Sequence, residues 1–202
     1  MSESDTTKTK SWKRELIEWG ILIGVAGVLW LTGLHTEVIG KIQQAILWTG
    51  VLQPDTEITA EQPIEADYNI PLVTLEGEQT TLEPFKNRVV FINFWATWCA
   101  PCIAEMPNID ALYERYRDNR EITFAMVSVD RELGKSREFI ENKEFSFPVY
   151  HLSGPRPAVY AGQVIPTTYV INKSGHIVAR SEGMANYNTR SFRAFLDTLI
   201  AE

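Results

Sequence analysis

The chain has 202 residues, 45% of them hydrophobic, and a formal net charge of −7 at pH 7. This composition is ordinary for a folded domain with attachments, and it excludes a low-complexity protein. Because the net charge is negative and no basic run follows the first fourteen residues, we expect no nucleic acid partner. Two cysteines and three scattered histidines do not form a four-ligand zinc motif, so we expect no metal site.

The first 36 residues have the composition of a membrane anchor. Residues 1–14 are polar and carry four basic side chains, and no charged residue occurs from Trp19 to Thr36. As a helix, this run spans roughly 27 Å, enough to cross the hydrocarbon core of a bilayer. We therefore expect a cytoplasmic tail at residues 1–14 and a single-pass transmembrane anchor at residues 15–36. A buried core helix and a cleaved signal peptide are the alternatives, although no A-x-A cleavage site follows the run.

The next thirty residues are expected to connect the anchor to a folded domain. Residues 37–52 place apolar side chains on one face of a helix. That face could lie on the outer membrane surface, or pack on the soluble domain or on another copy of the chain. Residues 53–66 carry four carboxylates and no basic residue, which predicts an acidic linker. The folded domain is expected to span residues 67–202.

Within the expected domain, segments typical of strands alternate with segments typical of helices. We expect strands at Tyr68–Leu75, Gln79–Leu82, Val89–Trp95, Ile122–Val129, Phe147–Tyr150, Thr167–Ile171 and His176–Ser181, and helices at Ala100–Arg117, Lys135–Lys143 and Asn188–Ala201. The run Val89–Trp95 is apolar on both faces, as in a central strand covered by helices on each side. The order of these elements predicts an α/β fold, a mixed sheet flanked by helices, preceded by the N-terminal transmembrane helix.

The only two cysteines, Cys99 and Cys102, follow this central strand in the sequence W-C-A-P-C. A disulfide across so short a loop constrains little of the unfolded chain, which favours thiol exchange over a structural staple. At the start of a helix, Cys99 is expected to have a lowered pKa and to be the exposed nucleophile. Cys102, one turn further along, is expected to resolve the mixed disulfide. A metal clip and two inert core cysteines are the alternatives.

Three motifs give the chain a resemblance to a known family: F-I-N-F-W-A-T-W-C-A-P-C, the E-M-P that follows it, and V-I-P-T-T-Y-V-I-N. Over about residues 67–200 the chain resembles the thioredoxin superfamily, and more closely the membrane-anchored TlpA/ResA-like thiol-disulfide oxidoreductases. The resemblance implies a thioredoxin-like fold with four helices and an inserted segment within residues 131–150. It also implies a cis peptide at Ile165-Pro166 beside the disulfide, in a segment with Thr167 whose backbone pairs with the substrate.

Two further side chains near the cysteines are candidates for the site. Thioredoxin has a buried aspartate where this chain has Asn93, and ResA-like proteins carry a glutamate at the position of Glu105. We expect Glu105 to exchange protons with a thiol, the alternative being a solvated helix glutamate. Trp98 could offer an apolar platform to an incoming peptide, or it could pack in the core. His151 is expected on the surface, as is His176.

These features lead us to expect an enzyme held at the cell membrane, with its thioredoxin-like domain in the periplasm or otherwise outside the cytoplasm. The resemblance implies that it reduces disulfides of envelope proteins, with apocytochromes before haem attachment among the candidate substrates. Such a reductase needs electrons from a membrane-embedded donor, and we expect no cofactor beyond the redox-active disulfide.

Three other functions fit parts of the sequence. The two thiolates could bind Cu(I) in an envelope copper protein, with His151 as a third ligand brought near by folding. A peroxide-reducing redoxin is the second alternative, but the Pro and the Thr or Ser that it needs at positions 92 and 96 are absent. A scaffold domain that merely retains the fold is the third, and the intact cysteine motif disfavours it.

Overall fold

The computed structural model describes Trp12, residues 15–21, 23–24, 52–54, 63–162 and 164–202, and Leu47. The expected anchor lies mostly outside these residues, and among the described ones no helix is long and apolar enough to span a membrane. Two units can be distinguished, Met1–Ile39 and Gly40–Glu202, and the second contains the folded domain.

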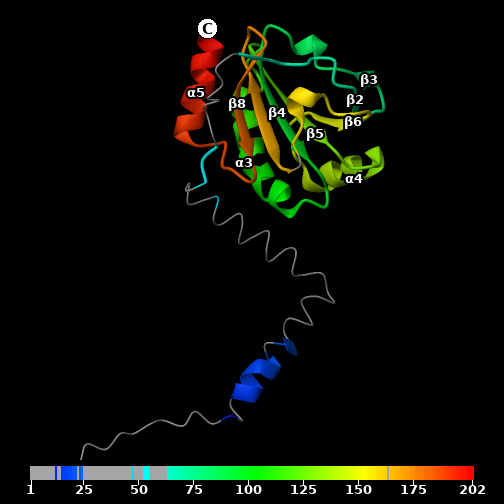
Figure 1. The fold of residues 1–202 in the computed structure, drawn as a ribbon, viewed down its shortest axis with the longest axis vertical. Helices are drawn as coiled ribbons and strands as arrows, with labels where there is room; N and C mark the ends of the chain where they lie inside the picture. Colours follow the sequence, from blue (N-terminus) through cyan, green and yellow to red (C-terminus); the bar gives the residue numbers. More distant parts are fainter. Residues whose placement is uncertain are drawn as a thin grey trace, which may run out of the picture. The chain divides into compact units, whose positions relative to one another are not determined.

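The domain is built on one eight-stranded mixed sheet with the strand order β1-β8-β7-β4-β5-β6-β2-β3 (Figure 1). The strands are β1 Ile64–Glu65, β2 Leu72–Thr74, β3 Gln79–Thr80, β4 Val89–Trp95, β5 Ile122–Ser128, β6 Val149–Leu152, β7 Thr167–Ile171 and β8 His176–Glu182. The helices are α3 Ala100–Tyr116, α4 Leu133–Lys143 and α5 Arg190–Ala201, with short 3-10 helices η1 Glu83–Phe85 and η2 Ala158–Tyr160. Strands β4, β5 and β6 are parallel, and β7 pairs antiparallel with β4. The predicted α/β fold with a mixed sheet is therefore confirmed.

Strand β4 lies inside the sheet and is buried along its whole length. Phe91 and Trp95 pack into a core that includes side chains of α3, α4 and α5. Ile92 and Phe94 pack into a second core, covered by residues 66–85 and by η2. Burial on both faces is thus confirmed, but the α-helices of the described domain cover one face only. Successive right-handed connections between the parallel strands β4, β5 and β6 place α3 and α4 on the same side.

The middle of the domain differs from expectation in two ways. Residues 63–162 and 164–202 contain three α-helices rather than the four that the resemblance implies. Strand β6 begins at Val149 and runs to Leu152, so His151 lies in a strand and not in an irregular surface segment. The expectation that His151 is a surface residue is wrong, because β5 and β2 flank it on both sides and leave 8% of it exposed.

The sheet begins at Ile64, upstream of the expected domain start and inside the expected linker. Strand β1 pairs antiparallel with β8 at one edge of the sheet. This pairing needs only backbone hydrogen bonds, so the sequence of β1 gives little sign of it. Further upstream, Leu47 is fully buried, and its carbonyl accepts a hydrogen bond of 3.1 Å from Asn186 Nδ2. Between the alternatives for residues 37–52, this contact favours packing on the domain.

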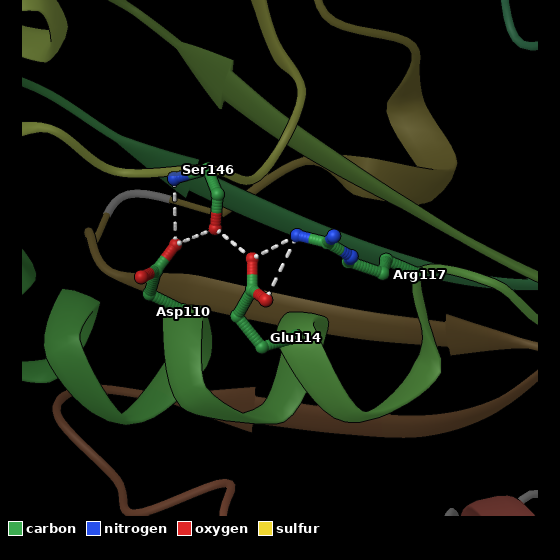
Figure 2. Close-up of polar contacts among 4 residues, drawn as sticks. All are labelled: Asp110, Glu114, Arg117 and Ser146. Carbon is green, nitrogen blue, oxygen red and sulfur yellow. Dashed lines mark hydrogen bonds and ion pairs between the residues drawn. The ribbon is translucent and has the colours of Figure 1, made fainter.

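A polar cluster ties the connection between α4 and β6 to α3 (Figure 2). Asp110 Oδ1 accepts hydrogen bonds from the backbone N–H and the hydroxyl of Ser146, at 2.8 and 2.9 Å. The same hydroxyl oxygen lies 2.6 Å from Glu114 Oε1, so its one proton is shared between the two carboxylates, and Arg117 donates to both oxygens of Glu114. Hydrogen bonds from Ser146 and Arg117 lower the pKa of Glu114 below its ordinary value. The cluster therefore joins the α4–β6 connection to the C-terminal half of α3, the half farther from Cys99.

Candidate active site

The two cysteines are joined by a disulfide at the point where the chain passes from β4 into α3. Cys99 is the N-cap residue of α3, and its Sγ accepts a hydrogen bond from the Cys102 backbone N–H at 3.3 Å. Pro101 occupies the first turn, where its missing N–H leaves no intrahelical bond unmade. Cys99 is 5% and Cys102 1% exposed, so Cys99 is the more accessible sulfur but is not the exposed one that we expected.

The Ile165-Pro166 peptide bond is cis, as the resemblance implies, and it lies beside the disulfide. The Ile165 carbonyl oxygen is 3.7 Å from Cys99 Sγ. Pro166 and Thr167 are buried, and the Pro166 carbonyl accepts a hydrogen bond of 2.8 Å from the backbone N–H of Gly183. Ile165 is half-buried, so among these three residues it is the one that borders the surface near the sulfurs.

Exposed apolar side chains adjoin the disulfide and the cis-proline segment in the sequence. Trp98 is 71% exposed, which excludes a core role for it, whereas Trp95 is fully buried. Val164, which the sequence analysis did not single out, is 48% exposed and precedes Ile165. Large apolar side chains left in contact with water beside a reactive group are typical of a surface that binds a partner.

Glu105 lies one turn after Cys102 and is completely buried, so it is not a solvated helix residue. Asn93 Nδ2 donates to its Oε1 at 2.7 Å, and the Ala185 backbone N–H donates to its Oε2 at 3.1 Å. Burial raises the pKa of Glu105 to about 8, while the hydrogen bonds from Ala185 and Asn93 act in the opposite direction. Asn93 Nδ2 also donates to Thr168 Oγ1 at 2.9 Å, which fixes the amide between β7 and the carboxyl.

A buried carboxylate, Asp130, holds the loop that leads to Cys99, and the sequence analysis missed it. Its oxygens accept hydrogen bonds from the backbone N–H of Thr97 at 3.0 Å and from the Thr97 hydroxyl at 2.9 Å. Ser128 Oγ donates a third bond at 2.9 Å, and Asp130 is 4% exposed. A signal for this contact was present: Asp130 follows a strand parallel to β4, and parallel strands end at the same edge of a sheet.

In the part of the chain that the structure describes, no three side chains of His, Cys, Asp or Glu gather as metal ligands. His151, the third copper ligand considered above, lies on β6, and β5 separates that strand from β4.

Comparisons with known proteins agree with this geometry. A family model described as Redoxin matches residues 54–192. The thiol-disulfide oxidoreductase ResA of Bacillus thuringiensis is 31% identical over 128 residues, which cover 63% of this chain and 70% of that protein. ResA of Halalkalibacterium halodurans is 34% identical over 130 residues, which cover 63% and 73%.

Solved structures show the same fold at lower identity. A thiol:disulfide interchange protein of the thioredoxin family from Chlorobium tepidum superposes with a TM-score of 0.56 at 22% identity. The match covers 70% of this chain and 99% of that one. At this identity the likeness supports the thioredoxin-like fold alone.

Glu105 should make stability depend on pH. Its folded-state pKa is about 8 against an ordinary value of 4.5, so between these values the folded protein keeps a proton that the unfolded chain loses. The free energy of unfolding should therefore fall as pH rises through this window, by up to about 5 kcal/mol at 1.4 kcal/mol per pH unit. Urea unfolding of the oxidised protein from pH 4 to 9 measures it.

The Glu105→Gln variant is the control for this prediction, since its side chain has no proton to lose. The difference in unfolding free energy between wild type and variant should change across the window and be flat above it. Parallel pH profiles for the two proteins would contradict a raised pKa at Glu105.

Replacing Asp130 with Asn should loosen the loop before Cys99, because an amide NH₂ would face donors that now bind a carboxylate. We expect Asp130→Asn to lower the free energy of unfolding by about 1–3 kcal/mol. The reaction of reduced Cys99 with a small disulfide should also slow several-fold. Ser146→Ala, in the cluster of Figure 2, is the matched control and should leave that rate unchanged. Equal rates in wild type and Asp130→Asn would refute the positioning role.

Proposed function

Because the chain belongs to the redoxin family and is a TlpA/ResA-like thiol-disulfide oxidoreductase of thioredoxin type, we propose that it reduces disulfides of cell-envelope proteins. The observation that carries this proposal is the Cys99–Cys102 disulfide at the start of α3, with the Ile165 carbonyl 3.7 Å from Cys99 Sγ and a buried carboxyl one turn away. Apocytochromes before haem attachment are the substrates that we propose to test first.

In the reduced enzyme, the Cys99 thiolate attacks one sulfur of the substrate disulfide and releases the other as a thiolate. The Cys102 thiolate then attacks Cys99 Sγ, frees the second substrate sulfur and forms the enzyme disulfide. Two electrons pass to the substrate, and its two sulfurs take up protons. The Cys102 N–H that points at Cys99 Sγ supports this order, because a helix N-terminus stabilises the Cys99 thiolate.

Glu105 is proposed to take the proton from Cys102, in its ionised carboxylate form, when that thiol attacks. A buried carboxyl with a pKa of about 8 lies close to the ordinary thiol pKa of about 8.5, so a proton moves between the two groups at little cost. The substrate peptide is proposed to lie across Trp98 and Val164 and to pair with the backbone at Ile165. Pro166 and Thr167 are buried, and they are proposed to hold the Ile165 backbone in position.

The proposed location is the cell membrane, with the domain outside the cytoplasm and residues 1–14 inside. The charge-free run from Trp19 to Thr36 supports an anchor, as do the exposed side chains of Ile17, Trp19 and Ile21. An anchored reductase remains near a membrane-embedded donor that returns two electrons to its disulfide. Peroxide reduction is not proposed, since Ile92 and Ala96 occupy the positions where the peroxidatic motif has Pro and Thr or Ser.

The exchange mechanism predicts opposite behaviour for the two cysteine variants. Cys102→Ser should accumulate a covalent complex with disulfide-bonded insulin or with an envelope protein, because no second thiol resolves the mixed disulfide. Cys99→Ser should form no such complex and should lose insulin reduction by at least about a hundredfold. Non-reducing electrophoresis with release by dithiothreitol measures both. Accumulation of the complex by Cys99→Ser, through Cys102, and not by Cys102→Ser would reverse the assignment.

The anchor predicts how the protein partitions between cell fractions. The full chain should remain in the membrane fraction after an alkaline carbonate wash, and a chain lacking residues 1–36 should move to the soluble fraction. Protease added to spheroplasts should degrade the domain while sparing a cytoplasmic marker. Survival of the domain under these conditions would place it on the cytoplasmic side.

A further inference from the structure

The loop of residues 183–188, between β8 and α5, contacts the active site at two points. The Gly183 backbone N–H donates to the Pro166 carbonyl at 2.8 Å. The Ala185 backbone N–H donates to Glu105 Oε2 at 3.1 Å, and Ala185 is 3% exposed. This loop, which we call the 183–188 loop, therefore touches both the cis-proline segment and the carboxyl beside the thiols.

The same loop binds residues that precede the domain. The Asn186 backbone N–H donates to the Leu52 carbonyl at 2.9 Å, and Asn186 Nδ2 donates to the Leu47 carbonyl at 3.1 Å. Leu47 is fully buried although it lies well upstream of the sheet. A further bond joins Ser191 Oγ to Gln53 Oε1 at 3.2 Å. We call the described residues Leu47 and Leu52–Pro54 the pre-domain segment.

We infer that Asn186 is a positioning residue, and that by binding the pre-domain segment it holds the Ala185 N–H against the Glu105 carboxyl. The residues that connect the expected anchor to the domain thereby influence how strongly Glu105 retains its proton. The inference concerns Glu105 itself, and it rests on the proposed function only for its consequence in thiol exchange.

The geometry explains why Asn186 has this influence. It follows Ala185 directly, so a shift of its backbone is passed through the Ala185 Cα to the Met184–Ala185 peptide, whose N–H binds Glu105. Other contacts hold the two ends of the loop. The Gly183 N–H binds the Pro166 carbonyl, and the ring centroids of Tyr187 and Phe91 are 5.3 Å apart. The middle of the loop is held by the pre-domain segment. Because a hydrogen bond weakens steeply as its geometry degrades, small movements there reach the carboxyl.

The groups around Glu105 allow a change in the Ala185 hydrogen bond to be measured as a change in the titration of Glu105. Asn93 from β4 and Ala185 from the 183–188 loop bind its oxygens, and neither carries a charge. Besides burial, these two hydrogen bonds are the influences on the pKa of Glu105. The titratable neighbours on α3 are Cys102 and the N-cap Cys99, which are silent while joined as a disulfide. Weakening the Ala185 bond should therefore raise the midpoint of the Glu105 titration.

The test is a carboxyl ¹³C NMR titration of the full-length oxidised protein in detergent micelles, with the Glu105 signal assigned by its loss in Glu105→Gln. Asn186→Ala and Leu47→Ala should each raise the Glu105 midpoint by roughly half a pH unit or more. Asn186→Ala acts from the loop side, and it also removes the bond of 3.0 Å that Asn186 Oδ1 accepts from the Asn188 N–H. Leu47→Ala acts from the segment side and leaves that bond and the loop sequence intact. If Asn186→Ala fails to fold by near-ultraviolet circular dichroism, Leu47→Ala decides the result.

Ser191→Ala is the matched control, because it removes the contacts of the Ser191 hydroxyl with Gln53 and Thr189 but leaves the three hydrogen bonds of Asn186 in place. Its midpoint should equal that of wild type. Wild-type midpoints in folded Asn186→Ala and Leu47→Ala, or an equal shift in Ser191→Ala, would overturn the inference. Insulin reduction by wild type is scored separately: its absence would remove the proposed function while leaving a shifted midpoint as evidence for the coupling.

Discussion

The Glu105 carboxyl is taken out of water by β4, α3 and the 183–188 loop, and each of its oxygens is met by one neutral N–H group. Two neutral donors offset only part of the cost of burying a negative charge, so the proton is retained to an unusually high pH. The site depends on this balance. It requires Asn93 on the central strand and Ala185 in the loop between β8 and α5, because these two residues donate to the carboxyl oxygens.

A second buried carboxylate, Asp130, does a different task at the end of the neighbouring strand. Its donors are the N–H and hydroxyl of Thr97 and the hydroxyl of Ser128, and they hold it in place at the sheet edge. Glu105 thus lies one turn after Cys102 on α3, whereas Asp130 binds Thr97 in the loop that precedes Cys99. The first is the proposed proton partner of the thiols, and the second holds the loop that leads to Cys99 at the start of α3.

Much of the fold followed from the sequence, because strong local patterns carried it. The run Val89–Trp95 and the cysteine spacing fixed β4 and the start of α3, and the resemblance supplied the cis bond at Pro166. Features that arise from pairing between distant segments were missed. Burial of His151 depends on β2 joining β6, and the contacts of Asp130 and Ala185 depend on loops whose local sequence is unremarkable. The partner of Glu105 on β4, Asn93, was noted only as a departure from thioredoxin.

Both outer strands of the sheet, β1 and β3, are only two residues long. Short edges give an extended polypeptide too few free backbone groups to add itself to a sheet. In the proposed reaction with disulfide-bearing proteins, such edges limit accidental association during each encounter. The proposed place for a substrate chain is the segment before β7, at Val164 and Ile165, where the Ile165 carbonyl is 3.7 Å from Cys99 Sγ.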